Sequence, residues 1–296
     1  MVKRRFLGFM GESKVLNVLN LHNNYNTKVR NMDYRNRLKN CKSLIVKVGT
    51  STITYSSGKL NLRRIDQLAR VLTDIRNRGI NVVLVSSGAI GVGSVRLGFE
   101  TRPTLMREKQ AAAAVGQAVL MQIYQNIFNE YNQKTAQVLV TKEDMSGNER
   151  PENIVNTFHT LWEFGVIPVV NANDTISTAE IGFSDNDNLA AQLGAFLKVD
   201  TLVLCTDIDG MYNCDPKKNP DAVKFSVIDE ITDEIQAMAG DKGSTFSVGG
   251  MSAKLTAAEL CMENGIDMIV ALGDDPYILY DIIDGKDVGT LFAGKR

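Results

Sequence analysis

Short apolar runs rich in β-branched residues alternate along the chain with longer segments in which apolar residues recur at helical spacing. The short runs predict strands, because strands buried on both faces of a sheet have continuous apolar sequences. They cover residues 43–48, 81–88, 135–140, 166–171, 201–207 and 267–272. The periodic segments predict helices. These cover residues 62–78, 107–131, 153–164, 188–197 and 251–264.

This alternation of strands and helices predicts the fold class. Strands separated by helices of this length are joined by βαβ crossovers, which give a mostly parallel sheet with helices on both faces. We therefore expect an α/β fold, an open three-layer α/β/α sandwich rather than a barrel. Ligands of such folds bind beyond the carboxyl ends of the strands. Four segments at these ends are rich in Gly, Ser, Thr, Asn and Asp: residues 47–51, 86–91, 171–175 and 205–210.

The composition is that of a globular chain and narrows the possible functions. Of the 296 residues, 44% are hydrophobic and 23% are charged, which excludes disorder, collagen and coiled coil as the dominant class. No apolar run approaches the ~20 residues that span a bilayer, so we expect no membrane partner. The four cysteines show no C-x-x-C spacing, which favours reduced thiols in the cytoplasm over a disulfide framework or a zinc site.

Charge is distributed unevenly along the chain. Residues 1–40 carry nine Lys and Arg against two Asp and Glu, whereas the remainder carries 24 against 32. An acidic body argues against a nucleic-acid partner, because phosphate affinity comes from clustered Lys and Arg. We interpret residues 1–40 as a basic, poorly ordered extension, or as an upstream start with Met32 as the natural first residue. Residues 41–296 are then expected to form one domain.

Two strand ends carry residues suited to anion chemistry. Lys47 lies at the carboxyl end of an apolar strand, where a buried lysine needs a carboxylate or a phosphate as its partner. Gly49 follows it and would let the backbone approach an anion. Ser87 and Gly88 offer a hydroxyl and backbone N–H groups at a second strand end. The structural alternatives are a salt-bridged lysine and ordinary connecting loops. Neither a P-loop nor a Rossmann glycine pattern occurs.

Two predicted helix starts add charge of both signs. Residues 248–254 place two glycines before a helix and Lys254 one turn into it, an arrangement that can bind phosphate. Asp187 lies at another helix start, where it could cap the helix, position the two lysines or hold a phosphate-bound Mg²⁺. Because His22 and His159 are the only histidines, a histidine base or metal site is not expected. The remaining class is phosphoryl transfer, which depends on positioning and charge.

Six segments in this order resemble the amino acid kinase family, and within it the kinases that phosphorylate glutamate: KVGTS, VSSGAIGVG, NANDT, SDNDNL, CTDIDGMY and GGMSAK. The resemblance runs from about residue 43 to residue 292. It implies that Lys47 and Lys254 stabilise the transferred phosphoryl group and that Asp187 orients them. It assigns ATP binding to Lys47, Gly49, Thr206, Asp207, Val248, Gly249, Gly250, Met251, Ser252, Ala253 and Lys254. It assigns substrate binding to Ser87, Gly88, Asn171, Asp174 and Asn186.

The sequence departs from the family pattern at two places. Val248 stands where Thr is common, which puts one nucleotide hydrogen bond in doubt. The sequence ends at Arg296, without the C-terminal RNA-modification-type (PUA) domain of many relatives, and we expect the kinase body to work without it. No residue is assigned as the ligand of a resident metal.

The reaction implied by the resemblance converts ATP and L-glutamate into ADP and γ-glutamyl phosphate, the first step of proline biosynthesis, with Mg²⁺ bridging the phosphates. It also implies feedback inhibition by proline at the glutamate site and a homo-oligomer, either a dimer or a tetramer. Two alternatives remain open. One is a related kinase for N-acetylglutamate, aspartate or carbamate; the other is an amino-acid sensor without catalysis. Retention of both lysines argues against the sensor, because ligand sensing needs no cations around a phosphoryl group.

Overall fold

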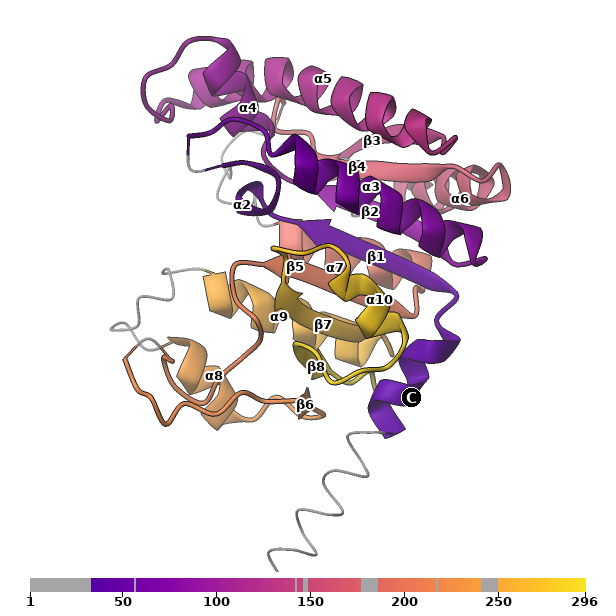
Figure 1. Ribbon diagram of the computed structural model, residues 1–296, viewed down its shortest axis with the longest axis vertical. Coiled ribbons are helices and arrows are strands. Elements are labelled where there is room, and N and C mark those ends of the chain that lie inside the picture. Colours follow the sequence, from indigo (N-terminus) through magenta and orange to yellow (C-terminus); the bar gives the residue numbers. More distant parts are fainter. Residues whose placement is uncertain are drawn as a thin grey trace, which may run out of the picture.

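The computed structural model describes residues 33–55, 57–141, 143–145, 149–176, 186–216, 218–240 and 250–296. Within them an eight-stranded sheet has the order β3-β4-β2-β1-β5-β7-β8-β6 (Figure 1). All neighbouring strands pair in parallel except β7 and β8, which are antiparallel. The strands are β1 (Ser43–Val48), β2 (Asn81–Ser86), β3 (Thr135–Val140), β4 (Ile167–Ala172), β5 (Thr201–Thr206), β6 (Val227–Ile228), β7 (Asp267–Leu272) and β8 (Thr290–Phe292).

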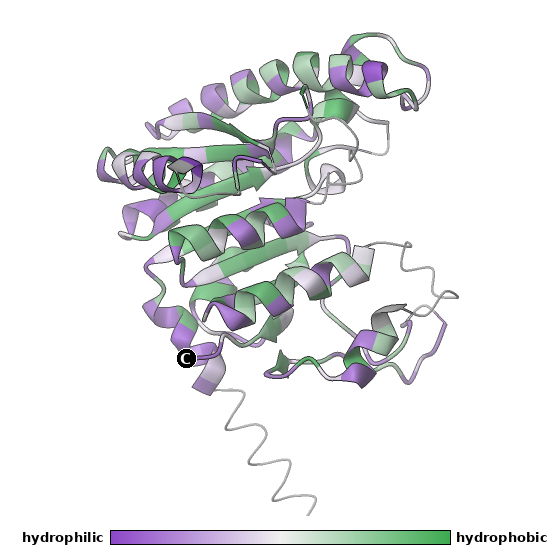
Figure 2. Ribbon diagram, turned by 180° about the vertical axis from the view of Figure 1, so that it is seen from behind, coloured by the Kyte–Doolittle hydropathy of each residue, from purple (hydrophilic) through white to green (hydrophobic). Residues whose placement is uncertain are grey.

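Helices cover both faces of this sheet, so the expected three-layer sandwich is confirmed. Alternate strand residues point to opposite faces: Leu44 and Val46 join one buried cluster, and Ile45 joins the other. The first face packs against α3 (Leu62–Asn77), α5 (Met106–Glu130) and α10 (Ile278–Ile283), and the second against α6 (Glu149–Glu163), α7 (Asn186–Leu197) and α9 (Gly250–Glu263). In Figure 2 the green, apolar strands lie between layers of mixed helices.

The six strands and five helices expected from the sequence are all present, with ends that differ by at most a few residues. The sequence pattern missed η1 (Leu38–Asn40), α2 (Thr50–Ile53), α4 (Ala89–Arg96), α8 (Asp233–Gly240), α10, β6 and β8. Most of these elements are too short to show a periodic pattern of apolar residues. Helix α4 has a different reason: its sequence AIGVGSVR contains two glycines, which favour a loop in the absence of a packing partner. None of the helices in the described ranges has the length and apolarity to cross a bilayer.

The end of the N-terminal extension needs correction. Residues 33–37 are helical and continue into η1, and Arg35 and Leu38 are only 3% and 1% exposed. The Arg35 guanidinium donates to the backbone oxygens of Val288 (2.6 Å) and Ser226 (2.7 Å). Residues 33–40 therefore pack on the rest of the fold, and the expected boundary at residue 40 is too late. Residues 1–32 lie outside the described part of the chain.

Candidate active site

The carboxyl ends of β1, β2, β4 and β5 lie together at one edge of the sheet. Val48 of β1 is in register with Ser86 on one side and with Cys205 on the other. This register brings Lys47, the segment after β2 and the end of β5 to the same edge. β1 and β2 are followed by α2 and α4, and Asn186 at the start of α7 is bonded to Ser87 and Asn171 beside these strand ends.

Lys47 and Lys254 meet at one carboxylate. Asp187, in the first turn of α7, lies 2.6 Å from the Lys47 Nζ through Oδ1 and 3.1 Å from the Lys254 Nζ through Oδ2. Asp187 is only 2% exposed, and burial raises the pKa of its carboxyl. The two ammonium groups and their hydrogen bonds outweigh burial and bring the pKa below its ordinary value. At neutral pH the group is thus an ionised carboxylate that fixes two cations.

The two cations come from elements far apart in the sequence. Lys47 lies on β1, and Lys254 lies in the first turns of α9, where its Nζ also donates to the backbone oxygen of Gly250 at 3.3 Å. Helix α9 packs against α7, so the start of α9 lies beside Asp187. A helix start with an added lysine favours a bound anion.

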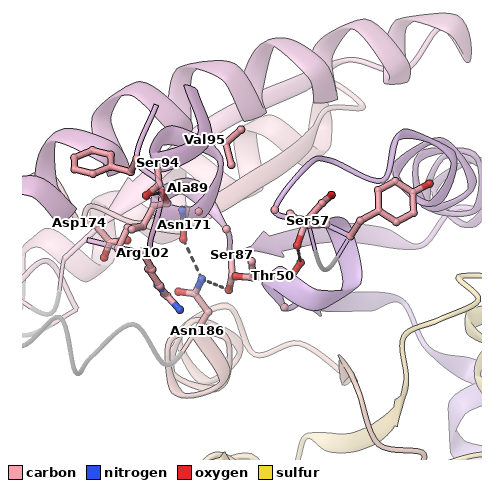
Figure 3. Close-up of a pocket in the computed structure, with 18 of the residues that line it drawn as sticks. Thr50, Ser57, Ser87, Ala89, Ser94, Val95, Arg102, Asn171, Asp174 and Asn186 are labelled. Atoms are coloured by element: carbon pink, nitrogen blue, oxygen red, sulfur yellow. Dashed lines mark hydrogen bonds between the residues drawn. The ribbon is translucent and has the colours of Figure 1, made fainter. Parts of the chain in front are cut away.

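A chain of buried amides holds the start of α7 against the ends of β2 and β4. The Nδ2 of Asn186 donates to Ser87 Oγ at 2.7 Å and to Asn171 Oδ1 at 3.0 Å (Figure 3). Asn171 in turn donates to Gln117 Oε1 of α5 at 3.0 Å. The Oδ1 atom of Asn186 is buried and has no hydrogen-bond partner among the described residues. That acceptor is available to a ligand.

These residues line a cavity of about 620 Å³. Its wall includes seven residues expected from the sequence: Lys47, Gly49, Ser87, Gly88, Asn171, Asp174 and Asn186. Figure 3 shows Ser87, Asn171 and Asn186 at its centre. Gly88 has a φ of +102° at the start of α4, a conformation that favours glycine. A Cβ at Gly49 would meet no protein atom closer than 3.9 Å, so the space above this glycine is open.

Asp174 differs from Asp187 in its surroundings. It follows β4, lines the cavity and is half-buried. Burial raises the pKa of its carboxyl above the ordinary value. A cationic group entering the cavity would favour its ionised form.

Apart from Lys47 and Gly49, the described residues expected to hold the nucleotide do not line this cavity. Thr206 ends β5 and is 8% exposed, and its hydroxyl accepts from the backbone N–H of Ile208 at 3.0 Å. Asp207 is exposed and does not line the cavity. Gly250, Met251, Ser252 and Ala253 form the first turn of α9 with Lys254. Val248 and Gly249 lie outside the described residues.

Sequence reasoning missed two parts of the cavity wall. One follows α2 and contributes Thr54, Tyr55, Ser57 and Gly58, and the other follows α4. Residues 99–102, in the connection between α4 and α5, contribute Phe99, Glu100, Thr101 and Arg102. Gln117, which supports Asn171, lies on a helix with a weak amphipathic pattern and gave no signal. The one clue available was that this connection carries two charged residues, Glu100 and Arg102, because binding residues often lie on loops.

The Lys47–Asp187–Lys254 cluster can therefore bind an anionic group through its two ammonium groups. It lies next to a polar cavity lined by the carboxyl of Asp174 and by the amides of Asn171 and Asn186. A family model described as the amino acid kinase family matches residues 42–271. This chain belongs to the amino acid kinase family. The resemblance expected from the six segments is thereby confirmed.

Proteins similar to this amino acid kinase include two named glutamate 5-kinase. The protein from Clostridium perfringens is 50% identical over 266 residues, which cover 88% of this chain and 99% of that protein. The protein from Listeria innocua is 49% identical over 266 residues, covering 88% of this chain and 96% of that protein.

Solved structures of other kinases share the fold. UMP kinase from Bacillus anthracis superposes with a TM-score of 0.58 at 16% identity, covering 85% of this chain and 95% of that one. Isopentenyl phosphate kinase from T. acidophilum superposes with a TM-score of 0.57 at 20% identity, covering 84% of this chain and 99% of that one.

Proposed function

We propose that this amino acid kinase is a glutamate 5-kinase, which transfers the γ-phosphoryl group of ATP to the γ-carboxylate of L-glutamate in the first step of proline biosynthesis. The observation that carries the proposal is the Lys47–Asp187–Lys254 cluster at the cavity, in a chain half-identical to a glutamate 5-kinase over almost the whole length of that protein. The products are ADP and γ-glutamyl phosphate.

The two lysines act on the charge of the transferred group. Its equatorial oxygens carry negative charge in the transition state, which fixed cations stabilise without reorganisation. Asp187 holds both ammonium groups in place before substrate arrives, at 2.6 Å and 3.1 Å. The γ-carboxylate of glutamate is already ionised at neutral pH, so the attack needs no general base. Lys47 lines the cavity and would therefore lie between acceptor and donor.

We assign the nucleotide to the side of Lys254, where Thr206, Asp207 and residues 248–254 would bind it. Gly49 leaves room above the backbone for a phosphate. In the described part of the chain no three His, Cys, Asp or Glu side chains form a cluster that could hold a metal ion. We therefore propose that Mg²⁺ enters as part of the substrate MgATP, held by the phosphate oxygens, which is common in kinases.

We assign glutamate to the cavity side. The half-buried carboxyl of Asp174 suits the α-ammonium group, and the unpartnered Oδ1 of Asn186 can accept a second hydrogen bond from it. Ser87 and Gly88, at the start of α4, supply a hydroxyl and backbone N–H groups to the carboxylates.

Three further properties belong to the same proposal. Proline would inhibit by occupying the glutamate side, because it shares the α-carboxylate and the α-ammonium. The protein would work as a homo-oligomer, a dimer or tetramer. It would act in the cytoplasm, in keeping with four cysteines that form no disulfide in the described structure.

The proposal is tested by trapping the product. Purified protein with MgATP and L-glutamate should release ADP and, in the presence of hydroxylamine, form an equal amount of γ-glutamyl hydroxamate, because hydroxylamine displaces phosphate from an acyl phosphate. ADP release without hydroxamate would mean ATP hydrolysis instead. Lys134→Ala changes an exposed lysine just before β3 and serves as the control. Any loss of activity in this variant measures the effect of purification and storage.

A further inference from the structure

Arg102 is an unassigned cation in the cavity wall. It lies in the connection between α4 and α5, and its side chain reaches into the cavity toward Asn186 (Figure 3). The other charged lining residues are Lys47, Glu100 and Asp174. Lys47 is already paired with Asp187. Among the described residues Arg102 forms neither an ion pair nor a hydrogen bond.

The backbone around Arg102 limits where its side chain can go. Arg102 precedes Pro103, and the residue before a proline is restricted to extended conformations. Pro103 itself is buried, and the segment before it is tied to α4 by the bond from Phe99 N to Ser94 O at 3.0 Å. The backbone that carries Arg102 is thus held against α4, whereas the arginine side chain itself is exposed.

Arg102 and Asp174 present opposite charges to the same cavity without pairing with each other in the described structure. The pKa of Asp174 is raised by burial alone, with no cation compensating for it. Glu100 also lines the cavity, so the unpaired charges of the described wall are one cation and two carboxylates. A ligand that carries both an anion and a cation can bind Arg102 and one of these carboxylates. An amino acid has these charges on one carbon.

We propose that Arg102 binds the α-carboxylate of the amino acid substrate through its guanidinium group. The inference rests on the proposed function and adds the residue that selects a free α-carboxylate. A guanidinium forms two parallel hydrogen bonds with a carboxylate, which fixes the orientation of the ligand as well as its affinity. With the α-carboxylate on Arg102 and the α-ammonium on Asp174, the side chain of the substrate extends toward Lys47.

The nucleotide is a less suitable partner for Arg102. Lys254, which would contact the phosphates, does not line this cavity, and Asp187 stands between it and Lys47. Arg102 lines the cavity together with Asn171, Asp174 and Asn186. Loss of its charge should therefore change glutamate binding and leave ATP binding unchanged.

The first test separates the two substrates. Arg102→Gln should raise the KM for glutamate about 10- to 100-fold, the range expected for a lost charge-assisted hydrogen bond, with kcat and the KM for ATP within about twofold of wild type. Arg102→Lys should lie in between, because it keeps the charge and loses the second hydrogen bond. Arg107→Gln, at an exposed arginine in the first turn of α5 outside the cavity wall, should behave like wild type.

The second test identifies the group that Arg102 recognises. The α-amide of glutamate keeps the ammonium and the γ-carboxylate but has no α-carboxylate. Wild type should favour glutamate over this amide in kcat/KM, and Arg102→Gln should reduce that preference at least tenfold. An unchanged glutamate KM in Arg102→Gln, an equal loss of ATP affinity, or a preference that survives the substitution would overturn the inference. Absence of glutamate-dependent ADP release by the wild type would instead refute the proposed function.

Discussion

Gly93 of α4 packs directly against the backbone carbonyl of Ala112 in α5, and a Cβ on Gly93 would overlap the Ala112 oxygen. Gly116 of α5 is in the same situation against the carbonyl of Ala89. The two helices therefore cross in direct backbone contact. Because Gly88 caps the start of α4 beside Ser87, this crossing fixes one wall of the cavity.

A methyl group at this crossing should loosen the site. Gly93→Ala should lower the free energy of unfolding by about 1–3 kcal/mol, because the backbones have to separate, and should raise the KM for glutamate. Gly91→Ala is the matched control for stability on the same helix, where the nearest contact of a Cβ would be an ordinary 3.7 Å; because Gly91 lines the cavity, it is not a control for the KM. Urea unfolding followed by circular dichroism measures both variants. Equal stability of the two would contradict the packing argument.

The lysines should matter for turnover more than for folding. Lys47→Ala or Lys254→Ala removes one fixed cation from the transferred group, and each should lower kcat by on the order of 10²-fold or more. Asp187 keeps one ammonium partner in either variant, so the fold should survive. Steady-state kinetics with both substrates saturating gives kcat, and near-normal kcat in either variant would remove that lysine from the mechanism. Lys134→Ala serves as the control.

Asp174 should give glutamate binding a dependence on pH. Only its ionised form can pair with the substrate ammonium, and burial raises the pKa of this carboxyl. The KM for glutamate should therefore be lowest above that pKa and rise as the pH falls through it. Asp174→Asn should have a high glutamate KM at neutral pH and lose this part of the pH dependence, with the ATP KM little changed.

The comparison of the two pH profiles is the measurement, because the γ-carboxylate of the substrate titrates equally in both experiments. Identical pH profiles for wild type and Asp174→Asn would show that Asp174 does not titrate with binding. A larger effect on ATP than on glutamate would assign the residue to the nucleotide side.

The N-terminal helix should be required from Arg35 onward. A chain that begins at Met32 keeps Arg35 and its bonds to the backbone oxygens of Val288 and Ser226, and should retain stability and kcat. Arg35→Ala should lower the free energy of unfolding by about 2–3 kcal/mol, because it leaves buried carbonyls without donors. Lys39→Ala, at an exposed position in η1, should be neutral. Thermal unfolding of the truncated chain, Arg35→Ala and Lys39→Ala measures these differences in stability. Loss of soluble protein on truncation would refute the expectation for the chain that begins at Met32.

The sequence predicted the strands and the chemistry more fully than the walls of the site. Buried strands such as β1 are continuous apolar runs, so their positions are readable without the fold. The association of Lys47 with Asp187 was also foreseeable, because a lysine in an apolar strand needs an anion. Nothing local indicates that α4 is a helix. Its glycines become favourable only when α5 supplies backbone for them to pack against.

The same reason explains why Arg102 and Gln117 were missed. Each acts through a partner distant in the sequence: Gln117 supports Asn171 on β4, and Arg102 reaches the cavity from a connection whose course depends on the α4–α5 crossing. A periodic pattern reports burial within an element, not the contacts of a loop with another element. The boundary at residue 40 was misplaced because Arg35 looks like a solvent-exposed charge until the backbone carbonyls of Ser226, Val288 and Gly289, just before β6 and β8, surround it.

The central claim is that the cavity beside Lys47 selects free L-glutamate as the phosphoryl acceptor. ADP release with MgATP should be measured for L-glutamate, N-acetylglutamate, aspartate and carbamate under identical conditions. L-glutamate should give the highest kcat/KM, because the carboxyl of Asp174 needs a free α-ammonium as its partner and Lys47 lines the same cavity. Faster turnover of N-acetylglutamate, or binding of glutamate without any ADP release, would contradict the account.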